Sequence, residues 1–480
     1  MITITNTNHW LIEQAQCSQD RIAVSTYTTT LSYQQFLNQA IMTAAFLLTK
    51  GIHKGDNVCI LSSHCYEFWV IVNALWFLGA VPVPLSTRNT KEEISWQINH
   101  VEAKHLIIFH APSEVKNVNQ IVLDDFDFQT NSIAERNIIL SSFYILYSSL
   151  ILFTSGSTGK PKAVVHTFNS LYESVRAMDS MFDLNSSDRW VASLPLYHIG
   201  GFLILVRALL AGCDVVFPAS LNHTDIVNEV KNSNPSHLSL VSTTLQRILE
   251  GKFKPNTNLK YVFLGGGPLS RPACEEAIEA GYPIVKVYGS TETCSMIAAL
   301  KPNEIKHKPD SVGKTLSEKI NIKGGNESRE ILISSPSLFK EYYNDDHATK
   351  AKIIDGCYHT GDFGSIDEDG FLYIDSRRED IIISGGENVS AKEVESELLS
   401  INTIKDVVVF GVPDTTWGQK VCAVIVSSQY DESILIQSLK EKLAGYKIPK
   451  QFFNVGEIPR NEMGKVKRNM LMKLLNLDEA

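Results

Sequence analysis

Short apolar runs alternate with helical patterns at residues 31–110 and 150–290, and this order constrains the fold more than any other feature. A capping serine at residue 32 opens a helix, residues 55–61 form a buried strand after a turn, and residues 66–78 form an apolar helix. Further apolar strands are expected at residues 191–194, 214–217, 238–241, 261–265 and 284–288. Parallel strands need a crossover, which is usually a helix. The order therefore predicts an α/β fold with parallel sheets layered with helices.

The pattern changes near residue 310, and 480 residues are in any case too many for one compact core. Residues 310–375 read as short β runs broken by Gly, Asp and Asn, which is typical of a small antiparallel or barrel-like subdomain. The charged stretch 376–380 is the expected hinge. We predict an N-terminal domain at residues 1–376, which contains the β subdomain, and a smaller, mobile α+β C-terminal domain at residues 380–480.

Composition restricts the classes of partner. Lys and Arg number 44 against 53 Asp and Glu, giving a net charge of −9, so neither nucleic acid nor an anionic membrane surface is an expected partner. The N-terminus lacks a secretory pattern, and no apolar segment is long enough to span a bilayer, which predicts a cytoplasmic protein. Eight scattered cysteines without zinc spacing predict reduced thiols and no structural metal site. The sequence leaves a homo-oligomer open.

A loop rich in hydrogen-bond donors follows the apolar run at residues 150–153. It reads Thr154, Ser155, Gly156, Ser157, Thr158, Gly159, Lys160, Pro161 and Lys162. Backbone N–H groups, hydroxyls and lysines of this kind cradle phosphates. The glycine spacing and Pro161 differ from a P-loop, and composition alone would fit a Ser/Gly linker equally well. Because residues 164–166 resume a strand at once, the loop joins two packed elements.

Seven motifs in order resemble the adenylate-forming superfamily of acyl-CoA ligases, luciferases and peptide-synthetase adenylation domains. After the phosphate loop come residues 194–198 (LPLYH), 265–270 (GGGPLS), 288–293 (YGSTET), 358–362 (YHTGD), Arg377, 384–388 (SGGEN) and 459–465 (PRNEMGK). The resemblance covers essentially the whole chain. It implies ATP and Mg²⁺ as cofactors and CoA as co-substrate.

The resemblance assigns the nucleotide contacts. It implies that Gly265, Gly266 and Gly267 let the backbone approach adenine and that Tyr288 stacks on the base. Thr291 would contact the α-phosphate, beside the nucleotide-binding Gly289, and Glu292 would hold Mg²⁺, a cation that takes oxygen ligands and substrate phosphates. Asp362 would accept hydrogen bonds from the ribose, with Arg377 on the sugar or phosphate. Outside these motifs, each residue would be read as an ordinary turn or surface group.

Lys465 resembles the lysine that bridges the attacking carboxylate and the α-phosphate. The carboxylate is already an anion, so the reaction needs charge neutralisation and alignment rather than a general base. The resemblance further implies that the C-terminal domain turns about residues 376–380 and brings Gly385 and Gly386 to the site for attack by the CoA thiol. Here Ser376 and Glu379 replace the Gly and Asp more usual at the hinge.

The identity of the carboxylic acid substrate is the remaining unknown. Residues 197–201 carry no Asp for a substrate ammonium, which argues against an amino acid. Within the superfamily, the segments at 161–167, 188–198 and 206–212 most resemble o-succinylbenzoate–CoA ligases of menaquinone synthesis, which implies a small aromatic dicarboxylic acid as substrate. Arg207 lies in an apolar helix, where a charge is costly unless paired. Either its guanidinium extends to the surface, or Arg207 binds, together with Ser239, the carboxylate of the substrate that is not activated.

His198 is expected at the acyl entrance as a substrate-binding and catalytic residue, although packing explains a lone histidine almost as well. Two alternatives stay open. The first is a ligase for a simple aryl or medium-chain fatty acid. The second is a catalytically silent nucleotide-binding sensor, against which the presence of both Glu292 and Lys465 argues.

Overall fold

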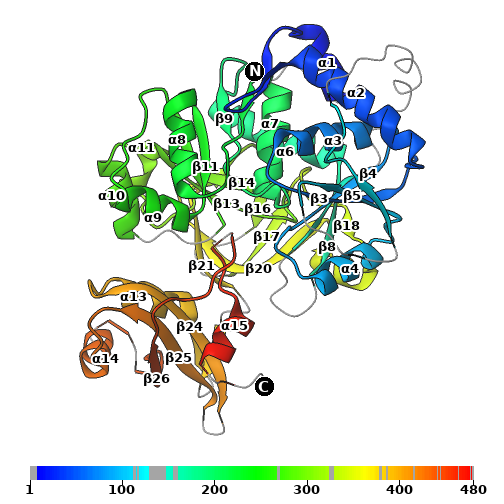
Figure 1. Cartoon of the computed structure of the whole chain (residues 1–480). Helices are drawn as coiled ribbons and strands as arrows, with labels where there is room; N and C mark the ends of the chain where they lie inside the picture. The colour runs from blue at the N-terminus through cyan, green and yellow to red at the C-terminus, as the bar shows by residue number, and fades with distance from the viewer. Residues whose placement is uncertain are drawn as a thin grey trace.

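A computed structural model of the chain describes residues 8–111, 115, 118–128, 148–154, 161–266, 271–323, 329–377, 381–384, 387–414, 417–440, 442–443, 445–462, 464–475 and 477. For residues 375–377, 381, 383, 387, 388, 418 and 469 it describes the backbone only. The chain forms a large N-terminal body and a smaller C-terminal domain beneath it (Figure 1). No helix in this part of the chain is long and apolar enough to cross a membrane.

The largest sheet in the described residues has nine strands. In spatial order they are β15 (Lys314–Thr315), β14 (Ser295–Leu300), β13 (Ile284–Ser290), β12 (Tyr261–Leu264), β11 (His237–Leu240), β9 (Arg189–Val191), β10 (Asp214–Val216), β1 (Ile22–Ser25) and β2 (Thr30–Ser32). The strands from β13 to β1 pair in parallel, as the sequence predicts. The edges are antiparallel, because the connections β1–β2 and β13–β14 are too short for a crossover.

Two further sheets complete the upper body. A parallel sheet consists of β4 (Val81–Leu85), β3 (Asn57–Ser62), β5 (His105–Phe109) and β6 (Asn119–Val122). An antiparallel sheet consists of β18 (Glu341–Tyr342), β8 (Ala163–Thr167) and β7 (Ser148–Phe153). The hairpin of β7 and β8 carries the phosphate loop between its strands.

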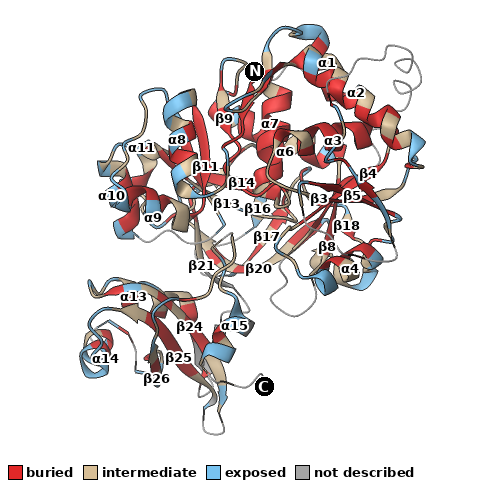
Figure 2. Ribbon diagram, in the orientation of Figure 1, coloured by how far each residue is buried: buried red, intermediate tan, exposed pale blue. Residues whose placement is uncertain are grey.

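Helices cover these sheets with their buried faces turned inward (Figure 2). They are α1 (Trp10–Cys17), α2 (Tyr33–Thr49), α3 (Tyr66–Leu78), α4 (Lys91–His100), α6 (Phe168–Phe182), α7 (Ile199–Ala211), α8 (His223–Ser233), α9 (Ser242–Glu250), α10 (Arg271–Glu279) and α11 (Pro302–Ile305). A capping box at Ser32 and Gln35 opens α2, as the serine predicts.

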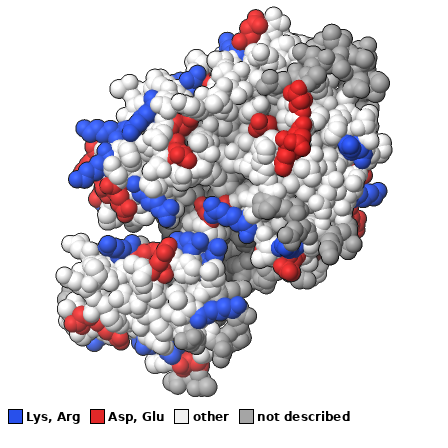
Figure 3. All heavy atoms as spheres, viewed as in Figure 1, with Lys and Arg blue, Asp and Glu red and all other residues white. Residues whose placement is uncertain are grey.

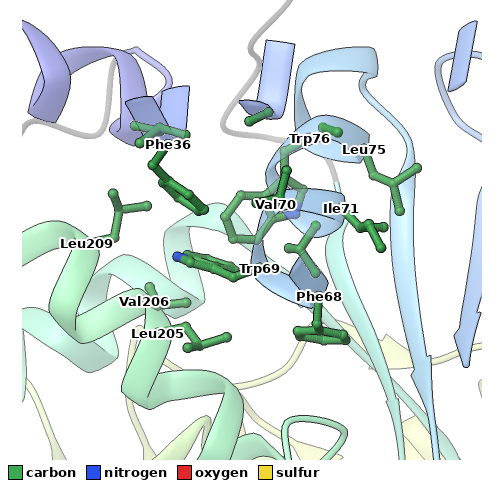
Figure 4. Packing of buried hydrophobic residues seen from close by; sticks show 14 of the residues in the cluster. Phe36, Phe68, Trp69, Val70, Ile71, Leu75, Trp76, Leu205, Val206 and Leu209 are labelled. Carbon is green, nitrogen blue, oxygen red and sulfur yellow. The ribbon is translucent and has the colours of Figure 1, made fainter. Parts of the chain in front are cut away.

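The main core lies between α2, α3 and α7. Every side chain of α3 except that of Glu67 is buried, because the helix is apolar on all faces. Trp69 lies between Phe36 and Val206 (Figure 4). Its ring meets that of Phe202 edge-on at 5.9 Å between centroids. This packing fixes α7, the helix that carries Arg207.

The lower face of the large body is antiparallel. Its sheet comprises β16 (Asn321–Lys323), β17 (Arg329–Ser334), β19 (Ile353–Ile354), β20 (Cys357–Ile366) and β21 (Leu372–Arg377), with α12 (Asp346–Lys352) beside it. Its pairings are antiparallel, as predicted for residues 310–375, but β15 and β18 of the same range pair in two other sheets. The strand β21 leads directly into the predicted hinge, of which residues 378–380 lie outside the described part of the chain.

The C-terminal domain has cores of its own. Its elements are β22 (Ile381–Ser384), β23 (Glu387–Ser390), α13 (Ala391–Leu399), β24 (Ile404–Asp414), β25 (Gly418–Ser427), α14 (Glu432–Lys440), β26 (Gln451–Asn454) and α15 (Arg468–Leu474). The two clusters of buried apolar side chains here draw only on residues 382–477. Such an arrangement allows the domain to move as a unit. The boundary at residues 376–380 stays a prediction.

Buried histidines predict an acid-sensitive large domain. Burial lowers the pKa of His9 to about 3 and the pKa values of His64 and His166 to about 4. The unfolded chain, with a His pKa of about 6.5, binds more protons below that pH, so stability falls from pH 6.5 towards 4 by up to about 1.4 kcal/mol per pH unit for each group. Calorimetry at pH 7.5, 6 and 5 should show a falling unfolding temperature.

The His9 side chain caps α1 by accepting a hydrogen bond from the N–H of Leu11 at 3.3 Å. His9→Asn keeps a capping acceptor but removes the titrating ring, so this variant should show a weaker pH dependence than the parent. An unfolding temperature that stays constant between pH 7.5 and 5 would contradict the expectation.

Candidate active site

The phosphate loop is closed at its base by contacts between its two ends. The N–H of Thr154 donates to the carbonyl of Lys162 at 2.9 Å, and the Thr154 hydroxyl lies 3.4 Å from the same carbonyl. The β7–β8 register pairs Phe153 with Ala163, so the loop leaves the sheet at one point. The predicted residues Ser155, Gly156, Ser157, Thr158 and Gly159 lie outside the described part of the chain.

The carboxylate of Glu292 is held beside this loop by Tyr342. The Tyr342 hydroxyl donates to Glu292 Oε1 at 2.9 Å, and Lys162 Nζ lies 4.8 Å from the centre of the Tyr342 ring. The Glu292 carbonyl accepts from the N–H of Phe339 at 2.8 Å. Because β18 pairs with β8 directly after the phosphate loop, Tyr342 links the predicted metal ligand to the loop lysine.

The residues present fit a magnesium ion that is shared with a nucleotide. The described residues contain no group of three or more His, Cys, Asp or Glu side chains able to enclose a metal ion. Mg²⁺ in nucleotide sites is usually held by one or two carboxylates together with substrate phosphates and water. Glu292, oriented by Tyr342 beside the phosphate loop, supplies such a carboxylate.

The predicted adenine and ribose residues contact each other. The hydroxyl of Tyr288, in β13, donates to Asp362 Oδ2 at 2.6 Å. Asp362 lies in β20, is almost fully buried, and is fixed through its N–H by the Thr360 hydroxyl at 2.9 Å. The Asp362 residue also pairs across the sheet with Arg377, whose side chain is not described. The structure therefore places Tyr288, Asp362 and the Arg377 backbone at one place.

A tight turn at residues 290–295 presents Thr291 and Glu292. The hydroxyl of Thr293 accepts from the N–H of Ser290 at 2.7 Å and donates within the turn, lying 2.9 Å from the carbonyl of Ser295. Cys294 and Ser295 have φ values of +59° and +74°, which are uncommon for residues other than glycine. The hydrogen bonds of Thr293 maintain this shape. Sequence reasoning passed over Thr293, although it stands inside the YGSTET motif.

The glycines of the predicted site are only partly described. A Cβ on Gly265 would lie 2.9 Å from Val287 Cγ2, and Gly266 has a φ of +84°, so both positions favour glycine. Gly267, Gly385 and Gly386 lie outside the described residues.

Arg207 is buried, which excludes the snorkelling interpretation. Its side chain is 1% exposed, and burial lowers its pKa to about 10. One guanidinium nitrogen donates to the Ser295 hydroxyl at 3.2 Å, whereas Nε has no hydrogen-bond partner among the described residues. The guanidinium carbon lies 5.7 Å from the centre of the Trp190 ring, and Trp190 Nε1 donates to the Ser239 hydroxyl at 3.1 Å. Trp190 thus connects the two predicted substrate residues.

Lys465 lies in a hairpin, here called the lysine hairpin (residues 459–462 and 464–467), in which Arg460 and Val466 form an antiparallel bridge. Arg460 donates to both oxygens of Asp406 at 3.1 and 2.7 Å and to the Gly464 carbonyl at 2.9 Å. Asn461 accepts the N–H of Lys465 at 2.9 Å through its side chain. Arg460 and Asn461 belong to the PRNEMGK motif, but the sequence alone predicts no role for them. In the structure they shape the loop around the lysine.

The lysine hairpin reaches the large domain. Figure 1 shows the chain between β26 and α15 rising towards the upper body, and a Cβ on Gly464 would lie 3.9 Å from Thr243 Cγ2. His198, which precedes α7, has a pKa lowered to about 4, first by burial and then by the positive charge of Lys465. The structure therefore brings Lys465 and a neutral His198 together.

Figure 3 shows Lys and Arg side chains on both sides of the hollow between the two domains, with Asp and Glu side chains beside them.

Tyr342 is the functional residue that sequence reasoning missed most completely. It stands in a charged stretch with no glycine-rich or histidine motif, and only its place beside β8 brings its hydroxyl to Glu292. No local signal in the sequence marks it.

Comparison with known proteins agrees with this geometry. Residues 11–343 match the family described as AMP-binding enzyme, and residues 393–465 match the AMP-binding enzyme C-terminal domain. The chain is 35% identical over 473 residues to the 2-succinylbenzoate–CoA ligase of Bacillus licheniformis, covering 96% of this chain and 99% of the relative.

Two structures from Bacillus subtilis are also similar. The o-succinylbenzoate CoA synthetase in complex with the acyl-adenylate intermediate OSB-AMP superposes with a TM-score of 0.90 at 32% identity, covering 97% of this chain and 98% of that chain. A double mutant of the same synthetase, bound with its product analogue OSB-NCoA, superposes with a TM-score of 0.74 at the same identity and coverage. With both of its domains matched in order, this chain belongs to the AMP-binding enzyme family.

Proposed function

We propose that this protein is an AMP-forming acid–CoA ligase that converts 2-succinylbenzoate, ATP and CoA into 2-succinylbenzoyl-CoA, AMP and diphosphate, a step of menaquinone biosynthesis. The observation that carries the choice of acid is Arg207, a buried cation whose Nε has no partner among the described residues and whose guanidinium reaches the turn that carries Glu292. The 2-succinylbenzoate–CoA ligase name of the relatives supports the same choice.

In the first half-reaction, a substrate carboxylate oxygen attacks the α-phosphorus of ATP and diphosphate leaves. The attacking group is an anion, so no proton has to be removed, and the neutral His198 serves to shape the entrance rather than to act as a base. Lys465 bridges the carboxylate and the α-phosphate and offsets their charges. Mg²⁺ on Glu292 would neutralise phosphate charge while the leaving group departs.

In the second half-reaction, the CoA thiolate attacks the acyl carbonyl and AMP leaves. Lys465 and the thiol need the same side of the intermediate, so the lysine hairpin has to withdraw. We propose that the C-terminal domain turns about residues 376–380 and presents Gly385 and Gly386 to the pantetheine. The TM-score of 0.90 with the OSB-AMP complex, against 0.74 with the OSB-NCoA complex, supports the proposal of two domain arrangements, with the adenylating one closer to this structure.

Arg207 would receive the carboxylate that is not activated. A dicarboxylate brings a second negative charge into an apolar pocket, where it needs a cation or several donors. Arg207 offers its unused Nε directly or through water, while Ser295 and the Trp190–Ser239 pair keep the surroundings polar. A monocarboxylic acid would leave this buried cation without a counter-charge.

AMP release with Mg-ATP and CoA tests the function over a panel of 2-succinylbenzoate, benzoate, octanoate and acetate. We expect kcat/KM to be highest for 2-succinylbenzoate. If octanoate or benzoate is turned over equally well, the protein is a fatty-acid or aryl-acid ligase instead. If ATP–diphosphate exchange is absent with every acid, the silent nucleotide sensor is the better description.

Arg207→Leu should raise KM for 2-succinylbenzoate by about 10- to 100-fold and leave KM for ATP within about 2-fold, because a charge-assisted hydrogen bond is worth roughly 1.5–3 kcal/mol. Leucine suits the apolar helix, so the unfolding temperature should not fall. Arg207→Lys, which keeps the positive charge, should raise KM for 2-succinylbenzoate by a smaller factor. Unchanged KM values for both substrates would remove Arg207 from the acid pocket.

A further inference from the structure

An ion pair joins the lysine hairpin to the large domain. Arg88, in the segment between β4 and α4, places Nε 2.9 Å from Glu462 Oε1. Glu462 precedes Lys465 by three residues in the lysine hairpin. The Arg88 segment is itself ordered by a hydrogen bond from its N–H to the Ser86 hydroxyl at 3.2 Å. The pair therefore connects the β4–α4 segment of the large domain to the loop that carries Lys465.

The two partners differ in their exposure to water. The Arg88 side chain is 69% exposed, whereas that of Glu462 is 13% exposed. Burial raises the pKa of Glu462, and the positive charges of Arg88 and Lys467 oppose that rise. A carboxylate held out of water is costly unless a cation compensates it. Arg88 supplies that compensation where the hairpin meets the large domain.

Within the hairpin, the positive charge of Lys467 also acts on the Glu462 carboxylate, but the hydrogen bonds that shape the described part of the hairpin come from other residues. The hairpin is shaped by Arg460 on Asp406 and by Asn461 on Lys465, together with the hydrogen bond from the N–H of Lys467 to the Pro459 carbonyl at 2.8 Å. In the described part of the chain, the ion-pair partner of the Glu462 carboxylate is Arg88, from the other domain. The contact thus has a role between domains rather than within one.

We propose that Arg88 and Glu462 form a latch that holds the C-terminal domain in the adenylating arrangement and opens before thioester formation. Arg88 is then a positioning residue for the first half-reaction, acting through the location of Lys465. The pair contributes only while the hairpin is docked, since Arg88 and Glu462 separate and the Glu462 carboxylate regains water when the domain turns away. It therefore favours one of the two domain arrangements. An interaction of equal strength in both arrangements would favour neither. The inference rests on the proposed ligase activity.

The two partners should respond unequally to substitution. Arg88→Gln leaves Glu462 buried without its cation, so we expect adenylation, measured as ATP–diphosphate exchange with 2-succinylbenzoate, to slow by about 5- to 20-fold. Glu462→Gln removes the buried charge and leaves Arg88 in water, so the loss should be smaller. The double variant should match Glu462→Gln rather than show the product of the two effects.

The second half-reaction supplies the discriminating readout. Conversion of supplied 2-succinylbenzoyl-adenylate and CoA in a single turnover should be unchanged or faster in all three variants, because opening becomes easier. Added salt should slow exchange in the parent protein more than in Glu462→Gln. The matched control is Arg271→Gln, an exposed arginine that pairs with Glu275 on its own helix α10 and should change neither half-reaction.

Equal slowing of both half-reactions by Arg88→Gln, or losses that multiply in the double variant, would overturn the latch. Failure of the proposed function looks different. The parent protein would then exchange diphosphate with another acid of the panel, or with none. In the first case the same comparison of variants is made with that acid, and in the second there is no adenylating arrangement for a latch to favour.

Discussion

Lys465→Ala should lower the rate of ATP–diphosphate exchange by about 100- to 1000-fold, the usual cost of removing a group that stabilises transition-state charge. The positive charge of Lys465 lies near His198, where the acid and the α-phosphate would meet. Supplied acyl-adenylate and CoA should still give thioester at nearly the parent rate, because this lysine has to leave before the thiol attacks.

Two measurements make that expectation specific. Lys473→Ala, which removes an exposed lysine of α15 just beyond the hairpin, should leave both half-reactions unchanged. The unfolding temperature of Lys465→Ala should equal that of the parent, since the side chain is exposed. If Lys465→Ala slows thioester formation as strongly as adenylation, the alternation of two arrangements does not describe this protein.

Gly289→Ala should abolish nucleotide binding and destabilise the large domain. A Cβ at this position would lie 1.8 Å from the carbonyl oxygen of Ser295 in β14, far inside any real contact. The obstacle is backbone, so β13 and β14 would have to separate, and Tyr288, Thr291 and Glu292 would move with them. Overpacking typically costs 1–3 kcal/mol, and here the strained turn adds to it, so we expect about 3 kcal/mol or more.

Calorimetry and equilibrium titration with ATP check this expectation together. Gly456→Ala is the control, because a Cβ there has no neighbour within 4 Å and the residue does not have a left-handed conformation. It should leave the unfolding temperature and ATP affinity near the parent values. Parent-like binding in Gly289→Ala would mean that the turn is more adaptable than its contacts indicate.

Local sequence patterns predicted helices and strands well where a single buried face or a single capping residue determines the element. The apolar helix predicted at residues 66–78 matches α3 in its bounds. Four of the five strands expected between residues 191 and 288 overlap β10, β11, β12 and β13, and each has a parallel neighbour. The strand expected at residues 191–194 was placed too late, because β9 spans Arg189–Val191. The antiparallel edges were not predicted, because they depend on how short connections fold back in three dimensions.

The residues of the candidate site could be predicted where they lie in contiguous sequence motifs. Tyr288 and Asp362 meet as their motifs imply, and Arg207 and Ser239 meet through Trp190. The roles of individual residues stay predictions until variants are measured. What sequence reasoning could not supply are contacts between distant residues that have no motif, such as Tyr342 on Glu292 and Arg88 on Glu462. These arise from sheet pairing and domain placement, which no single window of sequence contains.

The hydrogen bonds of Arg460 and Asn461 have a consequence for the speed of the catalytic cycle. They order the loop around Lys465 within the C-terminal domain alone, using Asp406 of β24 and atoms of the hairpin itself. The conformational entropy of ordering that backbone, about 1–2 kcal/mol per residue, is therefore lost once when the domain folds. In the proposed cycle, each turnover would then require rotation of a preformed domain rather than repeated ordering of a loop, so diffusion of the domain and breakage of its contacts would set the rate of alternation.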